Sequence, residues 1–324
     1  MRIVMLGTGA YAVPLLAELY ASAHEVVGVF TRPETKKNKK GIICPSPVRA
    51  RADQEAAKVF SPPDINTVSS HALLSNLQPD LFIVCDYGQI LSPETLSLAS
   101  YGGLNLHASL LPKYRGAAPI HWAIYHGESQ TGNTVIQMNA GVDAGPILAQ
   151  QTTQIGSTET TVDLESRLAT MGSVLILETM ERMTRGTLDP ITQNQGEMTR
   201  APKLQKKDGQ IDWTRSAIEI SNQIRAMTPW PKSFTYYCAN SGLPLRIIVD
   251  NASVRPVKSL SERDNSGYPG RVLIDELDDL SVQTGDGVLA INRLQPAGKR
   301  ILTAAEFLRG YRVNAGSRFA NSSG

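Results

Sequence analysis

The sequence predicts an α/β chain in which a parallel-sheet domain is followed by a small β-barrel domain. In the first part of the chain, short apolar strands alternate with segments of helical spacing, which is typical of a parallel sheet covered on both faces. In the last part, short β-rich runs are separated by Gly, Asn and Asp, which is typical of a small barrel. A length of 324 residues suits two compact domains.

The first domain is expected over residues 1–185 and opens with a βαβ unit. Residues 2–6 are an apolar run that ends in Gly-Thr-Gly, residues 13–20 have helical spacing, and residues 25–31 are a β-branched run. The later elements expected in this domain are strands at 81–85, 103–107 and 134–138 and a long helix at 160–184.

The pattern changes after residue 185. Residues 186–206 are polar, contain Pro190 and Pro202, and are predicted to be an inter-domain linker. The second domain is expected over residues 207–324, with a short helix at 216–226. Its five expected strands, whose number and spacing favour an OB-type barrel, are 233–238, 244–251, 270–274, 280–284 and 287–294.

The composition indicates an ordinary globular protein, with 41% hydrophobic and 19% charged residues. The three cysteines are odd in number and widely spaced, which fits neither a disulfide framework nor a metal-binding pair, so a reducing cytoplasm is expected. The five histidines have no ligand spacing, and no metal is expected. Neither export nor a membrane span is expected, because the first residues have the pattern of a short buried strand rather than of a signal peptide and no apolar run reaches the length of a membrane span.

The turn after the first strand matches the pattern G-x-G-x-x-A over residues 7–12. Such a turn lets the backbone approach a pyrophosphate at a helix N-terminus, so an NADP-dependent oxidoreductase is one alternative. The second strand ends without the acidic residue that binds ribose hydroxyls, although Arg32 could bind a 2′-phosphate. A tight turn that merely needs small residues is an equal alternative.

Two polar side chains share one face of the expected strand at 103–107. Because side chains alternate along a strand, Leu104 and Leu106 point one way while Asn105 and His107 point the other. Burial of an amide and an imidazole is costly unless both are satisfied, so they form either a hydrogen-bonded core pair or a catalytic pair. Asp143, between two glycines, is by itself most simply a turn residue.

Together these residues resemble a known family. The pattern N-x-H-x-S-L-L-P-x-x-R-G over residues 105–116, followed by G-x-D-x-G over 141–145, resembles the tetrahydrofolate-dependent formyltransferases. This family has a Rossmann-like domain, and the resemblance implies that Asn105, His107 and Asp143 are catalytic. It implies 10-formyltetrahydrofolate as the formyl donor. The residues that it implies for the folate pocket are Ser109, Leu110, Leu111 and Pro112. Tyr87 and Gly88, which follow the strand at 81–85, are candidates for a second wall, and a packing role is an equal alternative for Tyr87.

The second domain resembles that of the methionyl-tRNA formyltransferases, one branch of this family. The resemblance lies in residues 203–213, 224–231, 294–300 and 307–310, together with the loop at 45–48. It implies that the acceptor is initiator methionyl-tRNA, for translation initiation, with a sugar amine as the alternative acceptor. A monomer is expected. The cations expected to contact tRNA phosphates are Lys36, Lys37, Lys39, Lys40, Lys299, Arg300 and Arg309.

The chain departs from the family pattern at several positions. The family commonly has proline where this chain has Gly9, alanine where it has Asp86, aspartate where it has Asn139 and threonine where it has Ala144. The Lys-rich segment at 36–40 stands where the family usually has an arginine beside a glycine. None of these departures removes Asn105, His107 or Asp143, so the expected chemistry is retained.

Overall fold

The computed structural model describes residues 1–35, 41, 43–239, 243–255, 268–274, 279–311, 313 and 317–321. Within the chain, contacts define two compact units. The first comprises Met1–Ile120, Gln130–Gln154 and Asp163–Lys203, and the second comprises His121–Ser129, Ile155–Val162 and Leu204–Gly324. Four of the expected tRNA-contacting residues lie outside the described part: Lys36, Lys37, Lys39 and Lys40.

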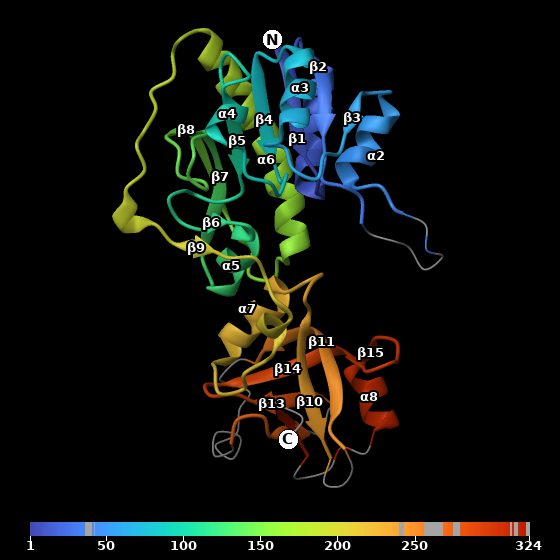
Figure 1. Cartoon of the computed structure of the whole chain (residues 1–324). Helices are drawn as coiled ribbons and strands as arrows, with labels where there is room; N and C mark the ends of the chain where they lie inside the picture. The colour runs from blue at the N-terminus through green and yellow to red at the C-terminus, as the bar shows by residue number, and fades with distance from the viewer. Residues whose placement is uncertain are drawn as a thin grey trace. The chain divides into compact units, whose positions relative to one another are not determined.

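A mixed sheet forms the centre of the first unit, and Figure 1 shows its strands. In the described residues its order is β3-β2-β1-β4-β5-β7-β8. The strands from β3 to β5 run parallel, as expected, whereas β7 and β8 add an antiparallel edge. The bounds are β1 Arg2–Gly7, β2 Glu25–Phe30, β3 Val59–Phe60, β4 Leu81–Cys85, β5 Gly103–His107, β7 Gln130–Gln137 and β8 Ile147–Gln154.

Helices cover both faces of this sheet. On one face, Val4 and Leu6 of β1 pack in one cluster with Leu74 and Leu77 of α3. On the opposite face, α6 approaches β5 so closely that a Cβ added to Gly172 would lie 2.8 Å from Leu106. The helices of this part of the chain are α1 Val13–Ala21, α2 Pro47–Gln54, α3 Val68–Leu77, α4 Pro93–Leu96, α5 Pro119–Tyr125 and α6 Thr161–Thr184, with short 3₁₀ turns η1 Ala10–Ala12 and η2 Gln195–Glu197.

The segment expected to be a linker pairs with the first unit. Its strand β9 (Arg200–Ala201) lies parallel to β6 (Arg115–Gly116), and Ile191 bridges Ile147 at the start of β8. These pairs fix the segment beside the loop that follows β5.

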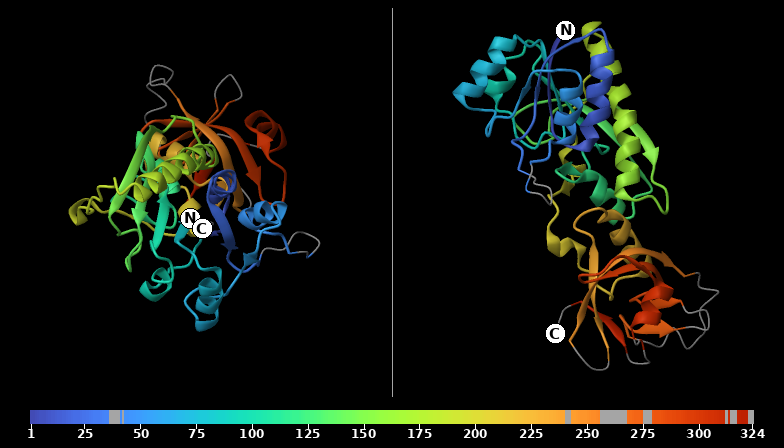
Figure 2. Two further views of the ribbon diagram at one scale, coloured as in Figure 1. Left: turned by 90° about the horizontal axis from the view of Figure 1, so that it is seen from above. Right: turned by 90° about the vertical axis from the view of Figure 1, so that its right-hand side faces the viewer.

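The second unit is a small antiparallel barrel with the strand order β12-β13-β14-β11-β10-β16 in the described residues. A backbone bridge between Arg271 and Arg318 returns β16 to the start of β12, so the sheet closes on itself (Figure 2). Trp213, Phe307 and Phe319 are among the large side chains in its core. The bounds are η3 Lys206–Gly209, α7 Ala217–Ala226, β10 Ser233–Cys238, β11 Leu245–Val254, β12 Val272–Ile274, β13 Leu280–Gln283, β14 Val288–Pro296, β15 Leu302–Thr303, α8 Ala304–Gly310 and β16 Arg318–Ala320.

Among the residues that the structure describes, no helix combines the length and the apolar character needed to cross a bilayer.

Candidate active site

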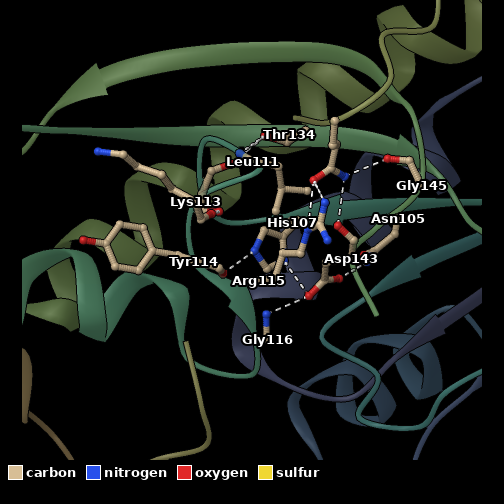
Figure 3. Close-up of polar contacts among 12 residues, drawn as sticks. Asn105, His107, Leu111, Lys113, Tyr114, Arg115, Gly116, Thr134, Asp143 and Gly145 are labelled. Carbon is tan, nitrogen blue, oxygen red and sulfur yellow. Dashed lines mark hydrogen bonds and ion pairs between the residues drawn. The ribbon is translucent and has the colours of Figure 1, made fainter. Parts of the chain in front are cut away.

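Asn105 and His107 lie on one face of β5, as the alternation of side chains predicts. Both side chains reach the same carboxylate, that of Asp143 (Figure 3). Asn105 Nδ2 donates to Asp143 Oδ1 at 3.1 Å, and His107 Nδ1 lies 3.6 Å from Asp143 Oδ2. The three residues that the sequence singles out therefore form one cluster at the carboxyl end of a sheet strand.

The conformation of the loop between β7 and β8 places Asp143 beside His107 and Asn105. Asp143 has a φ of 48°, in the left-handed region that aspartate tolerates better than most residues. Gly145 is required there, because a Cβ on it would lie 1.8 Å from the carbonyl oxygen of Gln137. Gly116 N donates to Asp143 Oδ2 at 2.8 Å, so a backbone amide also fixes the carboxylate.

The imidazole of His107 has an acceptor at each nitrogen. Nε2 donates to the carbonyl oxygen of Tyr114 at 3.0 Å, because a carbonyl oxygen can only accept. This contact places the proton of a neutral ring on Nε2 and leaves Nδ1 facing Asp143. A doubly protonated ring would instead direct an N–H towards each acceptor. The side chain of His107 is only 6% exposed and that of Asp143 only 11%, so water screens the pair weakly.

The glycine turn at residues 7–9 is occupied by Asp86. The amides of Thr8 and Gly9 donate to the backbone carbonyl of Asp86 at 2.9 and 3.4 Å. A Cβ added to Gly9 would lie 1.7 Å from Asp86 Oδ2, so the carboxylate takes the space that any larger residue at position 9 would need. The two departures from the family pattern, Gly9 and Asp86, thus explain each other.

The same contacts weaken the oxidoreductase alternative. A pyrophosphate would need the turn amides that Asp86 already binds, and it would meet the negative carboxylate. Although much of residue Asp86 is exposed, loss of water around its carboxyl group and the charge of Glu165 raise its pKa to about 6. Above that pH the turn carries a negative charge and repels phosphate.

The residues expected to line the folate pocket occupy different environments. Ser109, Leu111 and Tyr87 are buried, and Ser109 Oγ donates to the carbonyl oxygen of Lys113 at 2.7 Å. Leu111 packs with Ile136 and Ile147. The remaining three, which are at least partly exposed, are Leu110, Pro112 and Gly88. Burial favours a packing role for the first group, and contact with folate remains a prediction for all six.

The remaining cations expected to contact tRNA lie on the surface of the second unit. Lys299, Arg300 and Arg309 are all exposed. Arg300 is paired with Glu306 at 2.7 Å, so part of its charge is compensated. Arg246 is a further exposed cation of this unit, and its guanidinium lies 4.2 Å from the centroid of the Phe234 ring on the neighbouring strand.

Sequence reasoning missed the backbone groups that complete the site, namely Tyr114 O and Gly116 N, and the buried side chain of Gln193. Main-chain contacts leave no signature in the residue type. Arg115, which the family pattern includes, donates to Gln193 Oε1 rather than to Asn105, His107 or Asp143. In the described residues, no group of three or more His, Cys, Asp or Glu is arranged to hold a metal ion.

Comparison with known proteins gives consistent matches over almost the whole chain. A family model described as formyl transferase matches residues 1–180, and one described as formyl transferase, C-terminal domain matches residues 203–312. The methionyl-tRNA formyltransferase of Citrifermentans bemidjiense is 38% identical over 316 residues, which cover 98% of this chain and 95% of that protein. That of Pelotomaculum thermopropionicum is 39% identical over 310 residues, which cover 96% of each.

Solved structures share the fold at lower identity. WlaRD, a sugar 3N-formyl transferase, matches with a TM-score of 0.63 and 18% identity over 93% of this chain and 99% of its own. An N-formyltransferase from Helicobacter canadensis matches with a TM-score of 0.64 and 19% identity over 91% of this chain and 99% of its own. On the family matches and the full-length relatives, the chain belongs to the formyl transferase family.

Proposed function

We propose that the chain transfers the formyl group of 10-formyltetrahydrofolate to the amino group of methionine on initiator methionyl-tRNA, the formylation step of translation initiation. The observation that carries the chemistry is the cluster in which Asn105 and His107 converge on the carboxylate of Asp143. The acceptor is supported by relatives named methionyl-tRNA formyltransferase that are 35–39% identical over nearly the full length.

Attack by the amine is the first step. The lone pair of the unprotonated amine forms a bond to the formyl carbon, and the carbonyl oxygen becomes an oxyanion. An asparagine amide has two N–H groups, and that of Asn105 uses one on Asp143 Oδ1. The second N–H is directed to the oxyanion. One such donor is worth about 2.7–4 kcal/mol in other enzymes that form oxyanions.

Collapse of the tetrahedral intermediate breaks the bond between the formyl carbon and the folate nitrogen. The amine must lose a proton and the leaving folate nitrogen must gain one. His107 takes this proton from the amine at Nδ1, the ring nitrogen that carries no proton in the neutral form, and returns it to the folate nitrogen, with Asp143 Oδ2 3.6 Å away. Asp143 thereby stabilises the imidazolium that forms, as the carboxylate does in triads of other chemistry.

The fold of the second unit does not by itself select the acceptor. WlaRD and the Helicobacter canadensis enzyme match more than 90% of this chain, although WlaRD is a sugar formyl transferase and the other structure holds dTDP-3-aminofucose. A barrel domain is therefore compatible with a sugar amine as well. The argument for methionyl-tRNA rests on whole-chain identity and on the exposed cations Lys299 and Arg309.

Three incubations separate the alternatives. The purified protein receives 10-formyltetrahydrofolate with either charged initiator tRNA or a nucleotide-linked amino sugar, and a third sample receives NADPH with carbonyl substrates. The proposal expects formyl-methionyl-tRNA in the first sample only, and expects His107→Ala to abolish it while the far-UV circular dichroism is unchanged. Formylation of the sugar alone, or formylation by folded His107→Ala at a near-normal rate, would refute the proposal.

A further inference from the structure

A short stretch between the two domains of the family pattern forms hydrogen bonds with the two residues that contact the imidazole of His107, Asp143 and Tyr114. We call residues 191–201 the strap; it belongs to the first unit. The sequence predicts a linker here because the stretch is polar and has little periodicity. The structure instead shows side chains of the strap bonded to the two loops that supply Asp143 and Tyr114.

Gln193 joins the Asp143 loop to the loop after β5. Its Nε2 donates to the carbonyl oxygens of Asp143 at 2.9 Å and Gly145 at 2.7 Å. Its Oε1 accepts from Arg115 Nε at 3.0 Å and from Arg115 Nη2 at 2.6 Å. Gln193 is only 4% exposed, and these bonds satisfy both the nitrogen and the oxygen of its buried amide. Two of these four hydrogen bonds hold the turn at Asp143 and Gly145, and the other two hold the side chain of Arg115 in the loop after β5.

Thr199 holds the opposite side of the imidazole. Its Oγ1 accepts from the amide of Tyr114 at 2.8 Å, and its carbonyl oxygen accepts from the amide of Arg115 at 2.9 Å. The carbonyl of the same Tyr114 accepts from His107 Nε2. The strap thus supports the acceptor at each imidazole nitrogen, one through Gln193 and the other through Thr199.

We propose that Gln193 is a positioning residue for formyl transfer, which sets the distance between Asp143 and His107 without contacting substrate. This inference rests on the proposed roles of Asp143 and His107. The Asp143 backbone is left-handed, and the turn is confined by the close approach of Gly145 to Gln137. Loss of the Gln193 amide frees two carbonyls on that turn and lets the carboxylate drift. A misplacement of about 1 Å in a catalytic group can cost about a hundredfold in rate.

The test compares Gln193→Met with Gln195→Met. Gln195 is a matched control, because it lies in the same strap and accepts from Arg115 Nη1 at 3.1 Å, but it is exposed and its side chain bonds Arg115 rather than the Asp143 loop. We expect Gln193→Met to lower kcat about tenfold to a hundredfold with little change in KM, and to shift the pH profile of kcat. Gln195→Met should stay within about twofold of the wild type.

A double-variant cycle distinguishes positioning from general structural support. If Gln193 acts through Asp143, then Gln193→Met should add little to the loss already caused by Asp143→Asn. The inference would be overturned if the double variant lost kcat by the product of the two single-variant losses, or if folded Gln193→Met kept the wild-type kcat. If Gln193→Met does not fold, Gln193→Glu serves, because a carboxylate keeps the Arg115 contacts but cannot donate to two carbonyls when ionised.

Failure of the proposed function would be visible separately. In that case the wild type and Gln195→Met would both lack formyl transfer to methionyl-tRNA. The inference is then tested by amide hydrogen exchange of Gly116, whose N–H donates to Asp143 Oδ2 at 2.8 Å. Faster exchange of this amide in Gln193→Met than in Gln195→Met supports the inference, and equal exchange overturns it.

Discussion

Replacement of Asp143 by asparagine removes one charge and keeps the shape of the side chain. In the structure the carboxylate accepts from Asn105 at 3.1 Å and from Gly116 N at 2.8 Å, and it faces His107 Nδ1 at 3.6 Å. An asparagine must turn its NH₂ group towards one of those two donors, so it loses one acceptor as well as the charge. A unit charge pair at this separation is worth about 4–5 kcal/mol at an effective dielectric constant of about 20.

The expected effect of Asp143→Asn is a loss of about a thousandfold in kcat, since about 1.4 kcal/mol corresponds to a factor of ten. The assay is single-turnover formyl transfer from 10-formyltetrahydrofolate to methionyl-tRNA, with thermal unfolding measured in parallel. Asp189→Asn, at an exposed position of the same unit, is the control for the change of charge alone. If folded Asp143→Asn keeps more than a tenth of the wild-type rate, the carboxylate does not stabilise a charged imidazole in the transition state.

Further outcomes follow from single contacts. Gly145→Ala places a methyl group against the carbonyl of Gln137, so we expect a loss of stability of about 1–3 kcal/mol in chemical denaturation and a lower kcat. Gly9→Ala should destabilise the protein in the same way, and Asp86→Ala should restore most of the loss, because the added methyl group clashes with that carboxylate. Loss of water around the carboxyl group and the charge of Glu165 raise the pKa of Asp86 to about 6, so its ionisation opposes folding as the pH rises from the unfolded value of 3.8 through 6. Asp86→Asn should therefore gain stability relative to the wild type above pH 6 and lose that advantage near pH 4. Lys299→Ala should lower the slope of the logarithm of tRNA affinity against the logarithm of salt by about 0.7–0.9, the contribution of one phosphate contact.

The alternation of side chains along a strand accounts for most of what the sequence could predict about the site. The expected strand at 103–107 coincides with β5, and the two-residue period places Asn105 and His107 on the same face. The strands of the second unit were predictable for a similar reason, because its β-rich runs are separated by turn residues, and the expected runs at 233–238, 244–251 and 287–294 overlap β10, β11 and β14. Local periodicity reports which way a side chain points wherever the backbone is regular.

Irregular segments give no such signal. Gln193 is buried and bonds Asp143, Gly145 and Arg115, which lie 50, 48 and 78 positions away in the chain. Yet it stands in a polar stretch without hydrophobic periodicity. Asp143 has a positive φ, and its placement depends on the close approach of Gly145 to another strand. The sequence could show that these residues stand in turns, but only the folded chain shows which distant groups meet there.

The choice of acceptor is a question about the surface of the second unit rather than about its fold. The chemistry proposed for the site on β5 suits any unprotonated amine, and the sugar 3N-formyl transferase WlaRD shares the fold of almost the whole chain. A nucleotide-linked sugar offers two phosphates, whereas a tRNA offers a long backbone. The exposed cations Lys299 and Arg309 and the stacked pair of Arg246 and Phe234 suit the larger substrate. Three phosphate contacts by these cations should make the logarithm of the affinity for methionyl-tRNA fall against the logarithm of salt with a slope of about 2.1–2.7, at about 0.7–0.9 per phosphate neutralised. A slope near or below one would mean that the second unit contributes little to the acceptor, and the argument for tRNA would then depend on whole-chain identity alone.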